Sequence, residues 1–275
     1  MKTQSTMKRV ALGTLLAVGV AFAQTPALAN DKDYRGDNHG KDCAGLPSHK
    51  QLSNALDAVV DGGGNGGLAN EMWGTVVNRD GIVCAVVFTG HDRGDQWPGS
   101  RAISAQKAYT ANAFSLPSDA GFGGALSSGN LYGTVLEQGS LLGLQFSNPV
   151  DPQAAYAGNA KKFGQPNDPM TGNRVGGVNV FGGGLALYNK DGYLIGGLGV
   201  SGDTSCTDHV IAWKTRYSLN LDNVPGGVSG PAPGNDNLII ATPVTPGSFE
   251  HPDCGNGVAA IIDTLPTDFP IGPNP

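Results

Sequence analysis

Residues 181–213 read FGGGLALYNKDGYLIGGLGVSGDTSCTDHVIAW, and the strongest secondary-structure signals of the chain lie here. Two apolar runs, 185–188 and 193–200, flank the tetrapeptide NKDG at 189–192. An Asp-Gly pair supplies the positive φ angles of a tight turn between two strands. The second run is apolar on both faces and holds three glycines, so we expect other elements to pack closely on each side. The stretch therefore predicts an antiparallel hairpin with a buried second strand.

A helix is expected to follow the second strand. The strand pattern breaks at Ser201-Gly202, and Ser205 with Asp208 forms a capping-box pattern before an apolar run. The first N–H groups of a helix lack partners, so such an N-terminus favours anionic ligands or thiolates. A well-capped helix on a sheet explains the same residues without any ligand, and this is the default interpretation.

A second strand-turn-strand pattern lies upstream. Apolar runs at 72–77 and 82–88 flank NRDG at 78–81, which predicts the hairpin that starts the sheet. A polar loop that contains His91 follows at 89–99. A loop of this kind can line the mouth of a pocket, and a solvated loop anchored by Trp97 is the alternative that the sequence favours.

Helices and further short elements are expected around these hairpins. Ser48 can cap a helix with apolar residues at helical spacing, and Ser100 can cap another that runs from Arg101 to about Phe114. Weaker patterns predict a short helix around 130–137 and short edge strands at 239–240 and 258–262.

Two blocks of the chain carry specific motifs. They are Gly183, Gly184, Asp191-Gly192, the GGLGVSG run at 196–202, Thr204 and Asp208, and upstream NRDG at 78–81 with KAYTA at 107–111. With these motifs in this order, the chain resembles the GlcG/HbpS-like family. The family's small α+β domains have a profilin-like sheet, several bind haem or related tetrapyrroles, and some form oligomers. The resemblance implies a profilin-like antiparallel sheet of about five strands flanked by helices, with long Gly/Pro-rich loops and terminal extensions.

The N-terminus is typical of a secretion signal. A charged segment is followed by an apolar run at 10–23 and an A-x-A cleavage site at 27–29. We therefore expect a signal peptide at 1–29 and a periplasmic or secreted protein without membrane insertion after cleavage. Removing the peptide's three basic residues changes the formal charge from −6 to −9, which argues against nucleic acid as a partner.

The remaining chain divides into three parts by composition. A charged, glycine-rich extension at 30–46 precedes the GlcG/HbpS-like domain at 47–222. That domain holds a Pro/Gly/Asn-rich insertion near 120–175, and a C-terminal tail at 223–275 is expected to wrap around it.

Four cysteines in an exported chain predict two disulfides. From position alone, the pairing Cys43–Cys254 with Cys84–Cys206 is favoured, because the first would join the two extensions and the second the two core blocks. Three pairings are possible, so the choice is a prediction that peptide mapping can overturn.

Cys206 and His209 form the sharpest chemical pair in the sequence. They lie three residues apart at an expected helix N-terminus, where a thiol pKa is lowered and both side chains share one face. Thiol catalysis or haem ligation could use the pair, whereas a disulfide to Cys84 would remove the thiol and leave His209 as a ligand or acid/base.

The favoured hypothesis is an exported haem- or tetrapyrrole-binding protein without catalytic turnover, as the resemblance implies. His209 or His91 would ligate the iron, and Lys107 or Arg101 would meet the propionates. Some family members carry an acidic E-x-x-E associated with iron on the helix at 101–114. This chain has alanine at the matching positions, so that role is not carried over.

Two alternatives remain open. The first is an enzyme that acts on a small acidic metabolite with Cys206 and His209, or with Lys107. The second is a scaffold or interaction module in which glycine-rich strands and long loops build a homo-oligomer.

Overall fold

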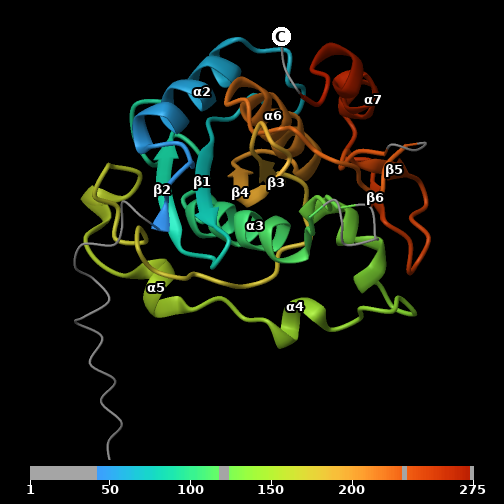
Figure 1. Ribbon diagram of the computed structural model, residues 1–275, viewed down its shortest axis with the longest axis horizontal. Helices are drawn as coiled ribbons and strands as arrows, with labels where there is room; N and C mark the ends of the chain where they lie inside the picture. The colour runs from blue at the N-terminus through green and yellow to red at the C-terminus, as the bar shows by residue number, and fades with distance from the viewer. Residues whose placement is uncertain (1–41, 118–123, 231–233, 273–275) are drawn as a thin grey trace, which may run out of the picture. The chain divides into compact units, whose positions relative to one another are not determined.

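The computed structural model describes residues 42–117, 124–230 and 234–272. The expected signal peptide and most of the expected N-terminal extension lie outside these residues. Within them, a four-stranded antiparallel sheet has the order β2-β1-β4-β3 (Figure 1). Its strands are β1 (Trp73–Asn78), β2 (Val83–Phe88), β3 (Gly184–Tyr188) and β4 (Leu194–Ser201). Both predicted hairpins are confirmed, and the α+β class is confirmed with four strands in this sheet where about five were expected.

The two hairpins join through their inner strands. Strand β1 pairs with β4 along its whole length, from Trp73 opposite Ser201 to Asn78 opposite Gly196. The turns that close the hairpins use glycines in the left-handed region, Gly81 at φ 76° and Gly192 at φ 76°. The local turn signals in the sequence therefore fixed both hairpins correctly.

Helices cover both faces of the sheet (Figure 1). Helices α2 (His49–Asp61) and α6 (Ser205–Ser218) pack on one face in a core that includes Leu56, Leu198 and Val210. Helix α3 (Ser100–Phe114) packs on the other face, where Trp73 and Val77 meet the alanines of the helix. Alternate residues of β1 belong to the two cores, as the period of a strand buried on both faces requires.

Strand β4 and helix α3 approach each other more closely than side chains on both elements would allow. A Cβ on Gly199 would lie 1.9 Å from the Ser104 carbonyl oxygen, and one on Gly197 would lie 2.3 Å from that of Ala108. Gly197 and Gly199 therefore allow the strand backbone to pack directly on helix α3.

The region 120–175 contains short helices, α4 (Leu144–Ser147) and α5 (Pro152–Tyr156), joined by irregular segments. The helix expected around 130–137 is instead a pair of 3₁₀ turns, Ser128–Leu131 and Gly133–Val135. Arg101 of α3 holds this region in place, because its guanidinium pairs with Asp168 and donates to the Ala155 carbonyl at 2.7 Å.

The C-terminal region supplies two strands and a helix. Strands β5 (Ile239–Ala241) and β6 (Glu250–Pro252) form a separate parallel pair. The expectation of an edge strand at 258–262 was wrong, since these residues begin helix α7 (Val258–Asp268), which packs against α6. A short apolar run fits a buried helix as well as a strand, which explains the error.

Helix caps agree with the sequence at one of three positions. Ser48 caps α2 in a full capping box with Gln51. Ser100 lies inside α3, and Gly99 precedes it without a side-chain cap. At α6 the cap is Thr204, which accepts from the Thr207 backbone N–H, so the predicted capping box at Ser205 and Asp208 was one residue out of register.

Two disulfides are present, but the favoured pairing was wrong. Cys43 bonds to Cys84, and Cys206 bonds to Cys254. The N-terminal segment runs beside the first hairpin, where Asn78 donates to the Asp42 carbonyl at 2.9 Å. The C-terminal segment instead passes the start of α6, so each terminal cysteine meets the core cysteine nearest to it.

Among the described residues, no helix combines the length and the apolar character needed to cross a membrane.

Candidate functional site

The loop between β4 and α6 is organised by the Asp208 carboxylate. One of its oxygens accepts from the backbone N–H groups of Gly202 at 3.0 Å and Asp203 at 2.9 Å. The other accepts from the Lys107 ammonium at 2.6 Å, which also donates to the Val200 carbonyl. Burial raises the pKa of Asp208 to about 6, and the neighbouring ammonium opposes this rise. The pair therefore joins α3 to α6 past the end of β4.

Lys107 is fully committed to this internal contact. Its side chain is buried, and both of its acceptors lie within the protein. The nearby glycines of the family motif leave no room either, since a Cβ on Gly183 would lie 2.4 Å from the Val200 oxygen. The motif residues at this junction thus join α3, β4 and α6, and they pack too closely to form a ligand site beside Lys107.

His209 follows Asp208 in helix α6, and none of its side chain is exposed. Its Nε2 lies 3.0 Å from the Asn237 side-chain oxygen, and its Nδ1 has no hydrogen-bond partner within the described part of the chain. Burial lowers the pKa of His209 to about 3, so the ring is neutral at physiological pH. Its ring centroid lies 6.1 Å from that of Trp213.

Arg101 is likewise engaged inside the protein. It forms a two-point pair with Asp168, and the Phe163 ring centroid lies 3.6 Å from its guanidinium carbon. The Arg101 side chain is buried, and the Asp168 carboxylate neutralises its charge.

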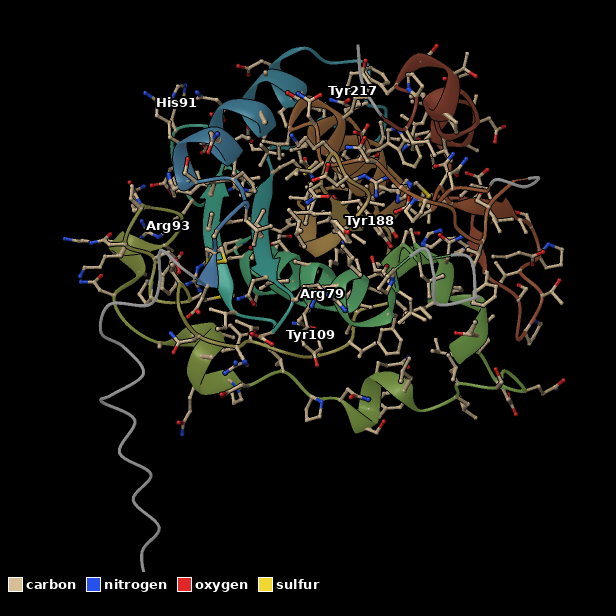
Figure 2. All side chains as sticks on the ribbon, viewed as in Figure 1. Arg79, His91, Arg93, Tyr109, Tyr188 and Tyr217 are labelled. Carbon is tan, nitrogen blue, oxygen red and sulfur yellow. A yellow bond between two sulfur atoms is a disulfide. The ribbon has the colours of Figure 1, made fainter. Side chains whose placement is uncertain are left out.

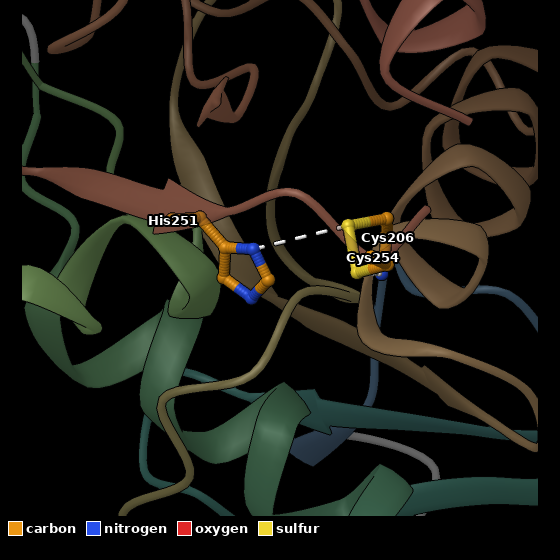
Figure 3. A group of neighbouring side chains, drawn as sticks. All are labelled: Cys206, His251 and Cys254. Carbon is orange, nitrogen blue, oxygen red and sulfur yellow. Dashed lines mark hydrogen bonds between the residues drawn. A yellow bond between two sulfur atoms is a disulfide. The ribbon is translucent and has the colours of Figure 1, made fainter. Parts of the chain in front are cut away.

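Cys206 has no thiol, because it is bonded to Cys254. Thiol catalysis by Cys206 with His209, the basis of one alternative, is therefore contradicted in this oxidised state. An imidazole that approaches the cysteine is that of His251 on β6, whose Nδ1 lies 3.9 Å from the Cys206 sulfur (Figure 3). Sequence reasoning missed His251, although the spacing of three residues between it and Cys254 was visible.

The polar loop at 89–99 is the exposed part of the predicted site. Among the described histidines, His91 alone is exposed, and its ring has no hydrogen-bond partner in that part of the chain. The Asp95 carboxylate accepts from the backbone N–H groups of His91 and Asp92, each at 2.8 Å, which fixes the loop and lowers the pKa of Asp95. In Figure 2, His91 and Arg93 both lie at the periphery of the described chain.

The same loop holds an unsatisfied buried amide. Gln96 is 4% exposed, yet neither polar atom of its side chain has a partner among the described residues. Leaving such a group unpaired costs about 1–3 kcal/mol. Its neighbour Trp97 is 53% exposed, an unusual position for an indole.

A pocket of about 180 Å³ opens between the end of α2 and the start of α6. Its walls include Asn65, Asn70, Asp203, Thr207 and Ile211, and no histidine lines it. The Asp203 carboxylate already accepts from the backbone N–H groups of Leu68 and Asn70. Pockets for drug-sized ligands measure about 300–1,000 Å³, so this one is too small to enclose a macrocycle.

An antiparallel sheet with α3 on one face and α2 and α6 on the other defines a small α+β domain. The chain belongs to the HbpS-like family, because the family model described as "Haem degrading protein HbpS-like" matches residues 70–216. This confirms the resemblance inferred from the sequence.

Three solved structures illustrate the similarity. Klebsiella pneumoniae protein ORFY is 20% identical with a TM-score of 0.39, covering 62% of this chain and 86% of that chain. The structure described as a PduOC:haem complex is 22% identical with a TM-score of 0.41, covering 62% and 91%. A double mutant of Streptomyces reticuli HbpS is 16% identical with a TM-score of 0.35, covering 75% and 96%. No curated protein matches the chain.

Proposed function

We propose that this chain is an exported protein that binds haem or a related tetrapyrrole without catalytic turnover, with His91 as the axial ligand. The observation that carries the proposal is the exposure of His91, in a chain whose family is described by haem chemistry. An imidazole must reach solvent to meet a ligand that arrives from outside. Burial of His209 argues against a role for that residue unless the tail from Asn237 onward moves.

The loop at 89–99 offers the residue types that a haem requires. Bound haem would supply the iron centre, and the His91 ring would donate a nitrogen lone pair to it. The exposed Trp97 indole offers a flat apolar surface, and the Arg93 guanidinium can pair with a propionate. Because Lys107 and Arg101 already hold internal carboxylates, we assign the propionate contact to Arg93.

Export is supported by the two disulfides, which are typical of oxidising compartments. The signal peptide at 1–29 completes this part of the proposal, with a mature chain that starts near Asn30.

Hemin titration of the mature protein tests the binding site. Wild type is expected to shift the Soret band with a saturable one-to-one stoichiometry, and His91→Ala is expected to weaken binding at least about tenfold through loss of the iron ligand. Asp92→Asn is the matched control, since it keeps the side-chain oxygen that accepts from Gly94 and leaves the imidazole in place. Unchanged binding in His91→Ala, with loss in His209→Gln, would move the site to the α6 junction.

The absence of turnover needs its own measurement, because the family's description names haem degradation. The hemin complex is incubated with ascorbate in air, and the Soret band is followed over hours beside free hemin. A stable band supports binding alone. Faster decay in wild type than in free hemin, with formation of a linear tetrapyrrole, would contradict the non-catalytic part of the proposal.

A homo-oligomer is our second proposal, on a separate observation. Leu142 and Phe146 are 60% and 80% exposed around α4, and Tyr156 at the end of α5 is 64% exposed. Several large apolar side chains exposed along one stretch of a chain are typical of an interface between chains. Light scattering is expected to give a multimer that Phe146→Asp dissociates, whereas a monomeric wild type would contradict this proposal.

A further inference from the structure

Three potential metal ligands meet at the start of α6 (Figure 3). The sulfur atoms of Cys206 and Cys254 and a ring nitrogen of His251 all lie within 4.8 Å of one another. Cys206 and His251 are buried, whereas Cys254 is partly exposed. Throughout the described residues, this is the one group of three His, Cys, Asp or Glu side chains with such close ligand atoms.

The spacing of these atoms matches a tetrahedral zinc site after one bond is broken. Zinc binds sulfur at about 2.3 Å and nitrogen at about 2.0–2.1 Å, so a nitrogen and a sulfur on one ion lie about 3.6 Å apart and two sulfurs about 3.8 Å apart. The His251 Nδ1 is already 3.9 Å from the Cys206 sulfur. The two sulfurs are bonded to each other, and reduction would let them separate to the distance required.

The surroundings of the cluster suit thiolates and a metal-bound imidazole. The Cys206 backbone N–H, in the first turn of α6, points at the Cys254 sulfur at 3.1 Å and can donate to a thiolate there. The Ser205 hydroxyl lies 2.7 Å from the His251 Nε2. A second-layer contact of this kind fixes the ring of a metal-bound histidine.

We propose that the Cys206–Cys254 disulfide is a redox gate for a Cys₂His site that binds a soft divalent cation such as Zn²⁺. The site does not depend on haem binding. A dithiol reductant breaks the sulfur–sulfur bond, is itself oxidised to a disulfide, and leaves two protein thiols. The cation then displaces both thiol protons. The proton on the His251 Nδ1, which donates to the Pro252 carbonyl at 2.8 Å, moves to Nε2, and the cation takes its place. Three protein ligands leave a fourth position for water.

The Cys43–Cys84 disulfide is an internal control for the proposed site, because it is a cysteine pair without a neighbouring histidine ligand among the described residues. Cys43 and Cys84 lie beside the first hairpin, and no third ligand completes a group with them among the described residues. Reduction alone is therefore insufficient to make a site, and the contribution of His251 distinguishes the two pairs.

The experiment titrates Co²⁺ into the mature chain, oxidised and after reduction by a phosphine that is then removed. Reduced wild type is expected to bind one equivalent, with thiolate-to-cobalt absorption that Zn²⁺ displaces, and the oxidised chain is expected to show no such band. His251→Ala, or His251→Gln if the alanine variant fails to fold, is expected to weaken binding at least about tenfold. Cys206→Ser/Cys254→Ser, which keeps reducible Cys43 and Cys84, is expected to show no band.

Several results would overturn the proposal. Equal cobalt binding by the oxidised chain or by the double serine variant would place the cation elsewhere. Absence of binding by a reduced chain with a native near-ultraviolet circular dichroism spectrum would show that the ligands do not converge. Loss of that spectrum on reduction, without recovery on addition of Zn²⁺, would show that the disulfide is purely structural.

Discussion

His209 is a buried imidazole whose charge state affects stability. Burial holds its pKa at about 3 in the folded chain, compared with 6.5 for an exposed histidine. The unfolded chain therefore binds one more proton than the folded chain between these two pH values. The contribution of His209 to stability is present above pH 6.5 and declines as the pH falls toward 3.

From this shift we predict that lowering the pH from 7 to 5 reduces the free energy of unfolding by about 2 kcal/mol through His209 alone. Urea unfolding at both pH values measures the loss in wild type and in His209→Gln, which keeps a polar group near Asn237 but cannot titrate. The pH dependence of the variant should be smaller by this amount. Equal pH dependence in the two proteins would contradict the assignment of a buried neutral ring.

At the residue scale, local patterns located reactive residue types but not their partners. The sequence placed Cys206 and His209 on one helix face, and both are indeed in α6. Their actual partners, Cys254 and Asn237, come from the tail, far along the chain. Contacts of this range depend on how the tail packs, which no local spacing encodes.

The partners of the charged side chains Lys107 and Arg101 also could not be predicted from local sequence. A lysine or arginine on a helix usually reaches solvent, so both were reasonable candidates for a propionate. Each instead meets a buried aspartate from a distant segment, Asp208 or Asp168. Removing one partner of such a pair leaves an uncompensated buried charge, and these side chains therefore have a structural role.

Elements with strong local signals were predicted well. Both hairpins follow from Asp-Gly turns between apolar runs, and α2 follows from the Ser48 cap and the helical spacing of its apolar residues. The run at 258–262 lacked a comparable signal and was assigned to the wrong type. Elements whose ends carry a turn or a cap could therefore be predicted from the local sequence.

At the scale of elements, we predict that the contact between β4 and α3 tolerates no side chain at Gly199. In Gly199→Ala the new Cβ would meet the Ser104 oxygen at 1.9 Å and the Ala108 nitrogen at 2.5 Å. Both are backbone atoms, so the helix itself must shift, and the cost should reach or exceed the roughly 1–3 kcal/mol typical of overpacked cores.

Urea unfolding midpoints measure the effect of Gly199→Ala. Gly99→Ala is the matched control, since Gly99 has an ordinary φ of −63° and nothing lies within 4 Å of its added Cβ. The control should stay near wild type. A Gly199→Ala protein as stable as the control would contradict the close packing of β4 on α3.

For the whole molecule, composition and position predicted two disulfides but not their pairing. The two core cysteines, Cys84 on β2 and Cys206 on α6, take partners from opposite ends of the chain. The family resemblance fixed the sheet and its helices over 70–216, and the segments outside that range supply Cys43, Cys254 and His251. The partners of both core cysteines therefore come from segments outside the matched range.

Haem binding at the loop at 89–99 can be located by nuclear magnetic resonance, with the paramagnetic iron of hemin as the probe. Amide signals of an isotope-labelled mature chain are recorded as hemin is added in steps. We predict that signals of residues 89–99 broaden first, while those around His209 and Asn237 keep their intensity. Broadening centred on the start of α6, or unchanged intensity of all signals, would show that haem does not bind at this loop.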